Sequence, residues 1–169
     1  MVHTFQPFPL EYLEMDVFKK IGQEWMLISA GDEQKANTMT ASWGGFGVLW
    51  GKNVATVYIR ESRYTKEFLD RQDSFSLTFL DEKYKREMKF LGAVSGRDED
   101  KMEEARLNFG YSMGIPYVDE GNLVFLCSKL SATPITKEHF IDPNIQSQWY
   151  ADGDYHTMYI GEILQVMAR

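Results

Sequence analysis

The chain has 169 residues, of which 44% are hydrophobic and 25% are charged, and its formal net charge is −7. This length is typical of one domain with a sizeable buried core, so residues 1–169 are expected to form a single domain. An acidic chain lacks the basic surface that attracts nucleic acid or an anionic membrane, which argues against either as the main partner.

The single cysteine and the short apolar runs limit the cellular compartments that are compatible with the sequence. Cys127 is the only cysteine, so an intrachain disulfide is excluded and a cytoplasmic location is the simplest expectation. Within the apolar run "LVFLCSKL" this thiol is interpreted as a core filler rather than a nucleophile. No segment approaches the ~20 apolar residues of a spanning helix, and no secretory signal is visible.

The first half of the chain contains mostly strand patterns. Leu10, Leu13, Val17 and Ile21 have near-helical spacing, which predicts a short N-terminal helix within residues 7–21. The other elements expected here are a buried strand (24–31), a polar turn (31–37), an alternating segment (38–47), a strand (53–60), a helix (62–72) and a half-buried strand (74–80).

The second half predicts two helices followed by two long strands. The expected helices cover residues 82–94 and 98–110, and the strands cover residues 122–133 and 155–167, with a turn at Asp152–Asp154 before the second. Strands outnumber helices and do not alternate regularly with them, as a parallel α/β fold requires. The pattern therefore predicts a mainly β fold, an antiparallel barrel with flanking helices.

The stretch "NTMTASWGGFGVLW" is rich in glycine but matches neither nucleotide motif. Gly45 and Gly47 lack the third glycine and the following helix of a dinucleotide fingerprint, and Gly51-Lys52 is followed by Asn53 rather than Ser or Thr. Glycines in a strand mark a bulge, a tight bend or a close approach to the backbone. The stretch is interpreted as a strand and bend that can face a ligand.

The segment "YIRESRYT" can form an anion site. Arg60 and Arg63 flank Ser62, a good helix N-cap, although the first turn of a helix normally favours acidic residues. Basic residues suit that position when an anion such as phosphate binds the free amides. The alternative, which the sequence leaves open, is a solvated helix end with Arg63 paired to Glu61 or Glu67.

The segment "SGRDEDK" and the histidines carry weaker signals. Ser95 or Asp98 can cap the next helix, and a capped charged loop explains this segment without any ligand. His3, His139 and His156 lack the spacing of metal ligands, so no metal site is expected.

The motifs "NTMTASW", "VYIRESRYTKEFL", "SGRDEDK" and "HTMYIGEI" occur in an order that resembles the flavin reductase-like, FMN-binding split-barrel family, especially its flavoredoxin-like members. The resemblance runs from about Glu24 to Val166. It implies a six-stranded antiparallel split β-barrel, a homodimer, and FMN bound near the dimer interface.

The resemblance also implies roles for individual residues. Those expected at the flavin ring or ribityl chain, or on the same strand, are Asn37, Thr38, Met39, Thr40, Ser42 and Trp43. Those expected near the phosphate are Arg60, Ser62, Arg63 and Thr65. Those expected in a loop that helps to close the site are Ser95, Arg97 and Lys101, of which the two cations are candidates to stabilise reduced flavin. His156 is the candidate catalytic residue beside the flavin or nicotinamide.

The segment "GGFGVLWGKN" departs from the Ser/Pro-containing loop of many relatives. Trp43 and Trp50 either stack near the flavin or pack in a core or interface. The resemblance implies an oxidoreductase that takes hydride from NAD(P)H and passes electrons to free flavin, ferric iron or a redox partner. The alternatives are an FMN-binding electron carrier or flavin store, and a structural dimer without cofactor.

Overall fold

The structure, a computed structural model, describes residues 4–169, so His3 lies outside the described residues. The strands are β1 (Gln6–Pro7), β2 (Met26–Gly31), β3 (Ala36–Ala41), β4 (Gly44–Leu49), β5 (Lys52–Arg60), β6 (Ser74–Phe79), β7 (Phe109–Ser112), β8 (Ile115–Val118), β9 (Leu123–Pro134) and β10 (His156–Ala168). The helices are α1 (Val17–Lys19), α2 (Tyr64–Arg71), α3 (Lys85–Ala93), α4 (Lys101–Ala105) and α5 (Pro143–Trp149). Shorter helical turns are η1 (Leu10–Tyr12), η2 (Lys20–Glu24), η3 (Glu82–Tyr84) and η4 (Lys137–His139).

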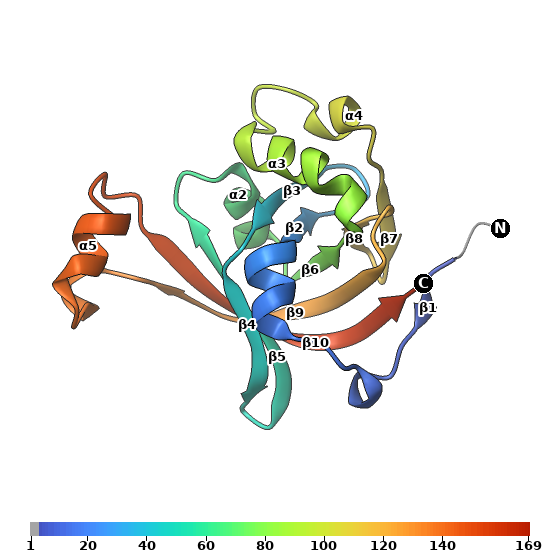
Figure 1. Ribbon diagram of the computed structural model, residues 1–169, viewed down its shortest axis with the longest axis horizontal. Helices are drawn as coiled ribbons and strands as arrows, with labels where there is room; N and C mark the ends of the chain where they lie inside the picture. Colours follow the sequence, from blue (N-terminus) through green and yellow to red (C-terminus); the bar gives the residue numbers. More distant parts are fainter. Residues whose placement is uncertain (1–3) are drawn as a thin grey trace.

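The main sheet is antiparallel and has the strand order β3-β2-β6-β9-β10-β5-β4, with β1 added beside β10 (Figure 1). Its two end strands, β3 and β4, are joined only by Ser42 and Trp43. The predicted mainly β, antiparallel architecture is confirmed. The sheet has eight strands rather than six, because the bend at Ser42 and Trp43 divides one expected strand and because β1 adds another. Among the described residues no ladder closes β3 onto β4.

The core lies between the inward faces of these strands. Ile28, Phe75, Phe125 and Tyr159 are completely buried in one cluster, and each such side chain contributes about 2–3 kcal/mol by burial. The polar face of β6 was expected to meet solvent, and this is wrong. That face is covered by β8, where the Ser76 hydroxyl donates a 2.6 Å hydrogen bond to the Pro116 carbonyl.

The expected N-terminal helix over residues 7–21 is largely wrong. Pro7 and Pro9 lack a backbone N–H and favour extended conformation before them, so only the short turn η1 forms there. Helical structure begins after Asp16, whose carboxylate accepts from the Lys19 amide at 3.1 Å, and it continues through η2.

The expected helix over residues 98–110 is also shorter than predicted. The N-cap is Asp100 rather than Ser95 or Asp98, and its side chain accepts a 3.1 Å hydrogen bond from the Glu103 amide. Arg106 adopts the left-handed conformation and ends α4, so the chain can enter the β7–β8 hairpin.

Residues 135–155 join β9 to β10 and are called the arm. Figure 1 shows the arm, with α5 near its tip, projecting to one side of the sheet, while α3 and α4 lie together on another side. The helix α5 was not predicted from the sequence. Within residues 4–169, every helix is too short or too polar to cross a bilayer.

Candidate functional site

A cleft of about 370 Å³ opens where the ends of β3 and β5 meet the start of β10. The β10–β5 ladder pairs His156 directly with Arg60, which brings residues far apart in the sequence to the same place. The lining residues are Met39, Thr40, Ala41, Ser42, Trp43, Tyr58, Arg60, Ser62, Arg63 and His156. The cleft therefore collects most of the residues expected to hold a ligand.

Asn37, Thr38 and Thr65 do not line this cleft, because their side chains connect β3 to its neighbours. The Asn37 amide donates a 2.8 Å hydrogen bond to the Thr65 hydroxyl on α2, and both residues are buried. The Thr38 hydroxyl donates to the Ile28 carbonyl of β2 at 3.1 Å. These hydrogen bonds tie the start of β3 to α2 and β2.

The charge of the cleft is opposite to that of the chain. Of the described residues that line it, Arg60 and Arg63 carry charge and none is Asp or Glu. The Arg60 guanidinium donates to the carbonyls of Asp154 at 2.6 Å and Trp149 at 3.1 Å, so it also secures the arm.

Arg63 is less occupied than Arg60. One of its terminal nitrogens donates a 3.0 Å hydrogen bond to the Gly92 carbonyl of α3. Burial, followed by the positive charge of Arg60, lowers the pKa of the guanidinium, whereas Asp154 acts in the opposite direction. Because a guanidinium has five N–H groups, Arg63 retains donors for an anion.

Ser62 has a different partner from the one expected. It was predicted as the N-cap of the following helix, but the N-cap of α2 is Arg63. The Ser62 amide and hydroxyl instead donate to the Asp154 carboxylate, at 3.1 Å and 2.5 Å. Asp154 comes from the turn before β10, so the sequence around Ser62 contains no sign of this contact.

Aromatic side chains form one wall of the cleft. The Trp43 ring lies 5.1 Å from the Trp149 ring, nearly perpendicular to it, and 5.1 Å from the His156 ring. Trp149 is the last residue of α5, so the arm brings it to the cleft. Trp50 lies at the tip of the β4–β5 hairpin, exposed and away from the cleft lining.

The His156 side chain is buried and has one hydrogen-bond partner, which lies on the arm. Its Nδ1 lies 2.7 Å from the Tyr150 hydroxyl, which is also buried. Burial, followed by the positive charge of Arg60, lowers the pKa of His156 to about 4, with Asp154 opposing the shift. The imidazole is therefore neutral near pH 7.

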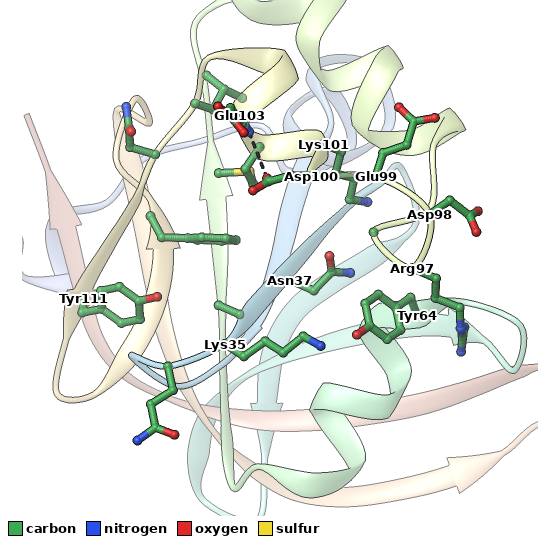
Figure 2. A pocket seen from close by; sticks show the side chains of 17 residues that line it. Lys35, Asn37, Tyr64, Arg97, Asp98, Glu99, Asp100, Lys101, Glu103 and Tyr111 are labelled. Carbon is green, nitrogen blue, oxygen red and sulfur yellow. Dashed lines mark hydrogen bonds between the residues drawn. The ribbon is translucent and has the colours of Figure 1, made fainter.

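A second, larger cavity of about 660 Å³ contains Asn37, Arg97 and Lys101 (Figure 2). Its Tyr64 ring lies 4.8 Å from the Arg97 guanidinium and 5.8 Å from the Lys35 ammonium. Four acidic residues share this lining: Asp98, Glu99, Asp100 and Glu103. The second cavity is therefore less suited to a phosphate than the first.

The three residues expected in a closing loop mainly support the protein itself. The Lys101 ammonium is buried and donates to the carbonyls of Leu91 at 3.0 Å and Val94 at 3.2 Å, at the end of α3. Burial, followed by Arg63, lowers the pKa of Lys101 to about 8. Arg97 pairs with Glu67, and the Ser95 hydroxyl accepts from the Arg97 amide at 3.2 Å.

Sequence reasoning missed four residues around the cleft: Tyr58, Trp149, Tyr150 and Asp154. Tyr58 could have been found, because it is two residues from Arg60 on a predicted strand and so shares its face. The others lie on the arm, whose path across the cleft depends on tertiary structure.

Comparisons with known proteins identify the family of the chain. A family model described as "Flavin reductase like domain" matches residues 18–169. None of the curated proteins matches the chain.

Solved structures share the fold at low identity. A flavin reductase-like FMN-binding domain from Shewanella baltica has a TM-score of 0.70 and 17% identity, over 98% of this chain and 77% of that one. A flavoredoxin from Methanosarcina acetivorans has a TM-score of 0.67 and 22% identity, over 86% and 68%. The styrene monooxygenase flavin reductase from Pseudomonas putida has a TM-score of 0.62 and 16% identity, over 86% and 79%. Because the family model spans almost the entire sequence, this chain belongs to the flavin reductase-like domain family.

Proposed function

We propose that the chain is an FMN-binding oxidoreductase that accepts hydride from NAD(P)H and passes electrons to free flavin, ferric iron or a redox partner. The observation that carries the proposal is the composition of the cleft. In a protein of net charge −7, it is lined by two arginines, two aromatic residues and a histidine, and none of its described lining residues is acidic. This combination suits a planar ligand with an anionic tail.

The residues present fit FMN. Ala41 and Ser42 have small side chains, which leave the backbone of the β3–β4 bend accessible to a flat ring. We assign the phosphate to Arg63, since the donors of Ser62 are already bonded to Asp154 and Arg60 holds the arm. We place the flavin ring against the segment from Met39 to Trp43, with His156 at the edge of the ring.

FMN, when bound, supplies the capacity to accept a hydride and release electrons. The residues of the chain hold and shield it. The Trp43 ring, packed against Trp149, forms one side of the cleft, and His156 offers a ring nitrogen to the ligand.

The alternative function is an FMN-binding electron carrier or flavin-storage protein without intrinsic NAD(P)H activity. It is supported by the flavoredoxin among the similar structures.

Anaerobic mixing of the FMN-loaded protein with NADH or NADPH tests the proposal. We expect the yellow absorption to bleach with at least one donor, faster than free FMN bleaches under the same conditions. Bleaching by dithionite but by neither nucleotide would assign the alternative. A protein that remains colourless after FMN is added and excess flavin is removed would contradict both functions.

We further propose a homodimer with the cofactor site near its interface. Large apolar side chains are exposed on the arm, including Ile141, which is 99% exposed, and Trp149 beside the cleft. Light scattering that gives the mass of one chain would contradict this assembly.

A cytoplasmic location is proposed on the basis of the single cysteine, Cys127, whose pKa is raised by complete burial.

A further inference from the structure

The hydrogen bond between Tyr150 and His156 joins the arm to the cleft. Tyr150 follows α5 and His156 begins β10, and the two residues lie six positions apart along the chain. Their polar atoms are 2.7 Å apart and both side chains are buried. A hydrogen bond in this setting is shielded from competition with water.

The direction of this hydrogen bond follows from counting protons. Within residues 4–169 the Tyr150 hydroxyl has no other hydrogen-bond partner, so Nδ1 of His156 is the one acceptor to which it can donate. Burial raises the pKa of Tyr150, with Arg60 opposing the shift, and the phenol therefore keeps its proton near pH 7. An Nδ1 that accepts a hydrogen bond carries no proton of its own, which leaves the proton of the neutral imidazole on Nε2.

We propose that Tyr150 is a positioning residue that fixes His156 as the Nε2–H tautomer, so that His156 presents a neutral N–H donor to an acceptor atom of the ligand. A carbonyl oxygen or an unprotonated ring nitrogen of a planar heterocycle has the required chemistry. The part concerning the ligand rests on the proposed function, whereas the tautomer is a property of the protein alone.

The surroundings of His156 favour this neutral donor over an imidazolium. Arg60 on β5 and Arg63 before α2 oppose a further positive charge, and only the Asp154 carboxylate favours one. Tyr150, the remaining titratable neighbour, is a neutral phenol. His156 therefore donates a hydrogen bond without supplying a proton to the reaction near pH 7.

The Tyr150 ring packs against two other rings and a guanidinium, which orients its hydroxyl. It stacks against Phe140 at 5.5 Å and Tyr155 at 5.0 Å, and the Arg60 guanidinium lies 5.4 Å from its centre. Tyr155 provides a matched control, since it belongs to the same stack but donates its hydroxyl to the Gln146 side chain at 2.7 Å.

Nitrogen-15 NMR of the histidine side chains, on the full chain without FMN, tests the tautomer directly. In the wild type we expect Nδ1 of His156 to resonate as an unprotonated nitrogen and Nε2 as a protonated one, from about pH 6 to pH 8. Tyr150→Phe removes the donor and is expected to give a mixture of tautomers, while Tyr155→Phe keeps the wild-type pattern.

FMN and riboflavin titrations give the second readout. Because the donor would meet the heterocycle rather than the phosphate, Tyr150→Phe is expected to weaken both ligands by the same factor, about threefold to tenfold. Tyr155→Phe is expected to change neither affinity.

A proton on Nδ1 of His156 in the wild type, or an unchanged tautomer in a folded Tyr150→Phe, would overturn the inference. The wild-type spectrum alone determines the tautomer of His156, even if the Tyr150→Phe variant fails to fold. If the tautomer is as expected and the wild type binds neither flavin, the ligand assignment fails together with the proposed function. If the wild type binds both and folded Tyr150→Phe loses no affinity, only the positioning role fails.

Discussion

His156 acquires its properties from residues on the arm and on β5. Tyr150 on the arm contacts its Nδ1, Arg60 is its partner in the β10–β5 ladder, and Asp154 lies just before it. The sequence identified His156 only through a family resemblance, because the contacts with Tyr150 and Arg60 depend on how the arm and the β10–β5 ladder fold. Burial and the nearby arginines therefore keep the imidazole of His156 neutral near pH 7.

The low pKa of His156 predicts a loss of stability in acid. An unfolded histidine titrates near ~6.5, whereas burial lowers the pKa of His156 to about 4 in the folded protein. Between these values the unfolded chain binds more protons, so stability is present above about pH 6.5 and is lost as pH falls towards 4. We expect this group to lower the free energy of unfolding by about 1–2 kcal/mol between pH 7 and pH 5.

Urea unfolding at both pH values measures this effect. His156→Gln should show a smaller pH dependence than the wild type, and His139→Gln, at an exposed position, should retain the wild-type dependence. Identical pH dependence in all three proteins would contradict the assignment.

The hairpin formed by β4 and β5 shows how single glycines support an element. Gly51 in its turn has a φ of +69°, a conformation that costs an L-residue about 1 kcal/mol. Gly47 lies in β4 of the same hairpin, without a positive φ, and a Cβ added there would meet no atom within 4 Å. The two glycines therefore differ in backbone conformation, although both have open space around them.

Gly51→Ala should lower the free energy of unfolding by about 1 kcal/mol, because alanine is strained at positive φ. Gly47→Ala is the control and should raise it by up to about 1 kcal/mol, since alanine restricts the unfolded chain. Chemical denaturation of both variants measures the difference. Equal effects at the two positions would show that the turn conformation is not what Gly51 provides.

Elements with strong local patterns were predicted well. β5, β9 and β10 lie within one or two residues of their expected bounds, because β-branched and aromatic runs between turn residues are a local signal. The arm and the β7–β8 hairpin were missed, since their stability comes from tertiary contacts such as the bond from Ser76 to Pro116. Partners of Ser62 and Thr65 were missed for the same reason.

The cleft differs in charge from the molecule as a whole. A net charge of −7 disfavours anions over most of the surface, but the cleft lining contains Arg60 and Arg63 and, among described residues, no carboxylate. Folding places these arginines beside the ends of β3 and β10, which are far apart in the sequence. An anionic ligand is therefore expected at this cleft more than elsewhere.

The most direct test of the account is the affinity of Arg63→Ala for FMN and for riboflavin, measured by fluorescence titration beside the wild type. We expect FMN to bind roughly tenfold or more weakly, because a charge-assisted hydrogen bond to phosphate is lost, and riboflavin to be almost unaffected. Arg71→Ala removes the same charge from the far, exposed end of α2 and should change neither affinity. An equal loss for both ligands in Arg63→Ala, or no loss for either, would contradict the claim that Arg63 anchors the phosphate of FMN.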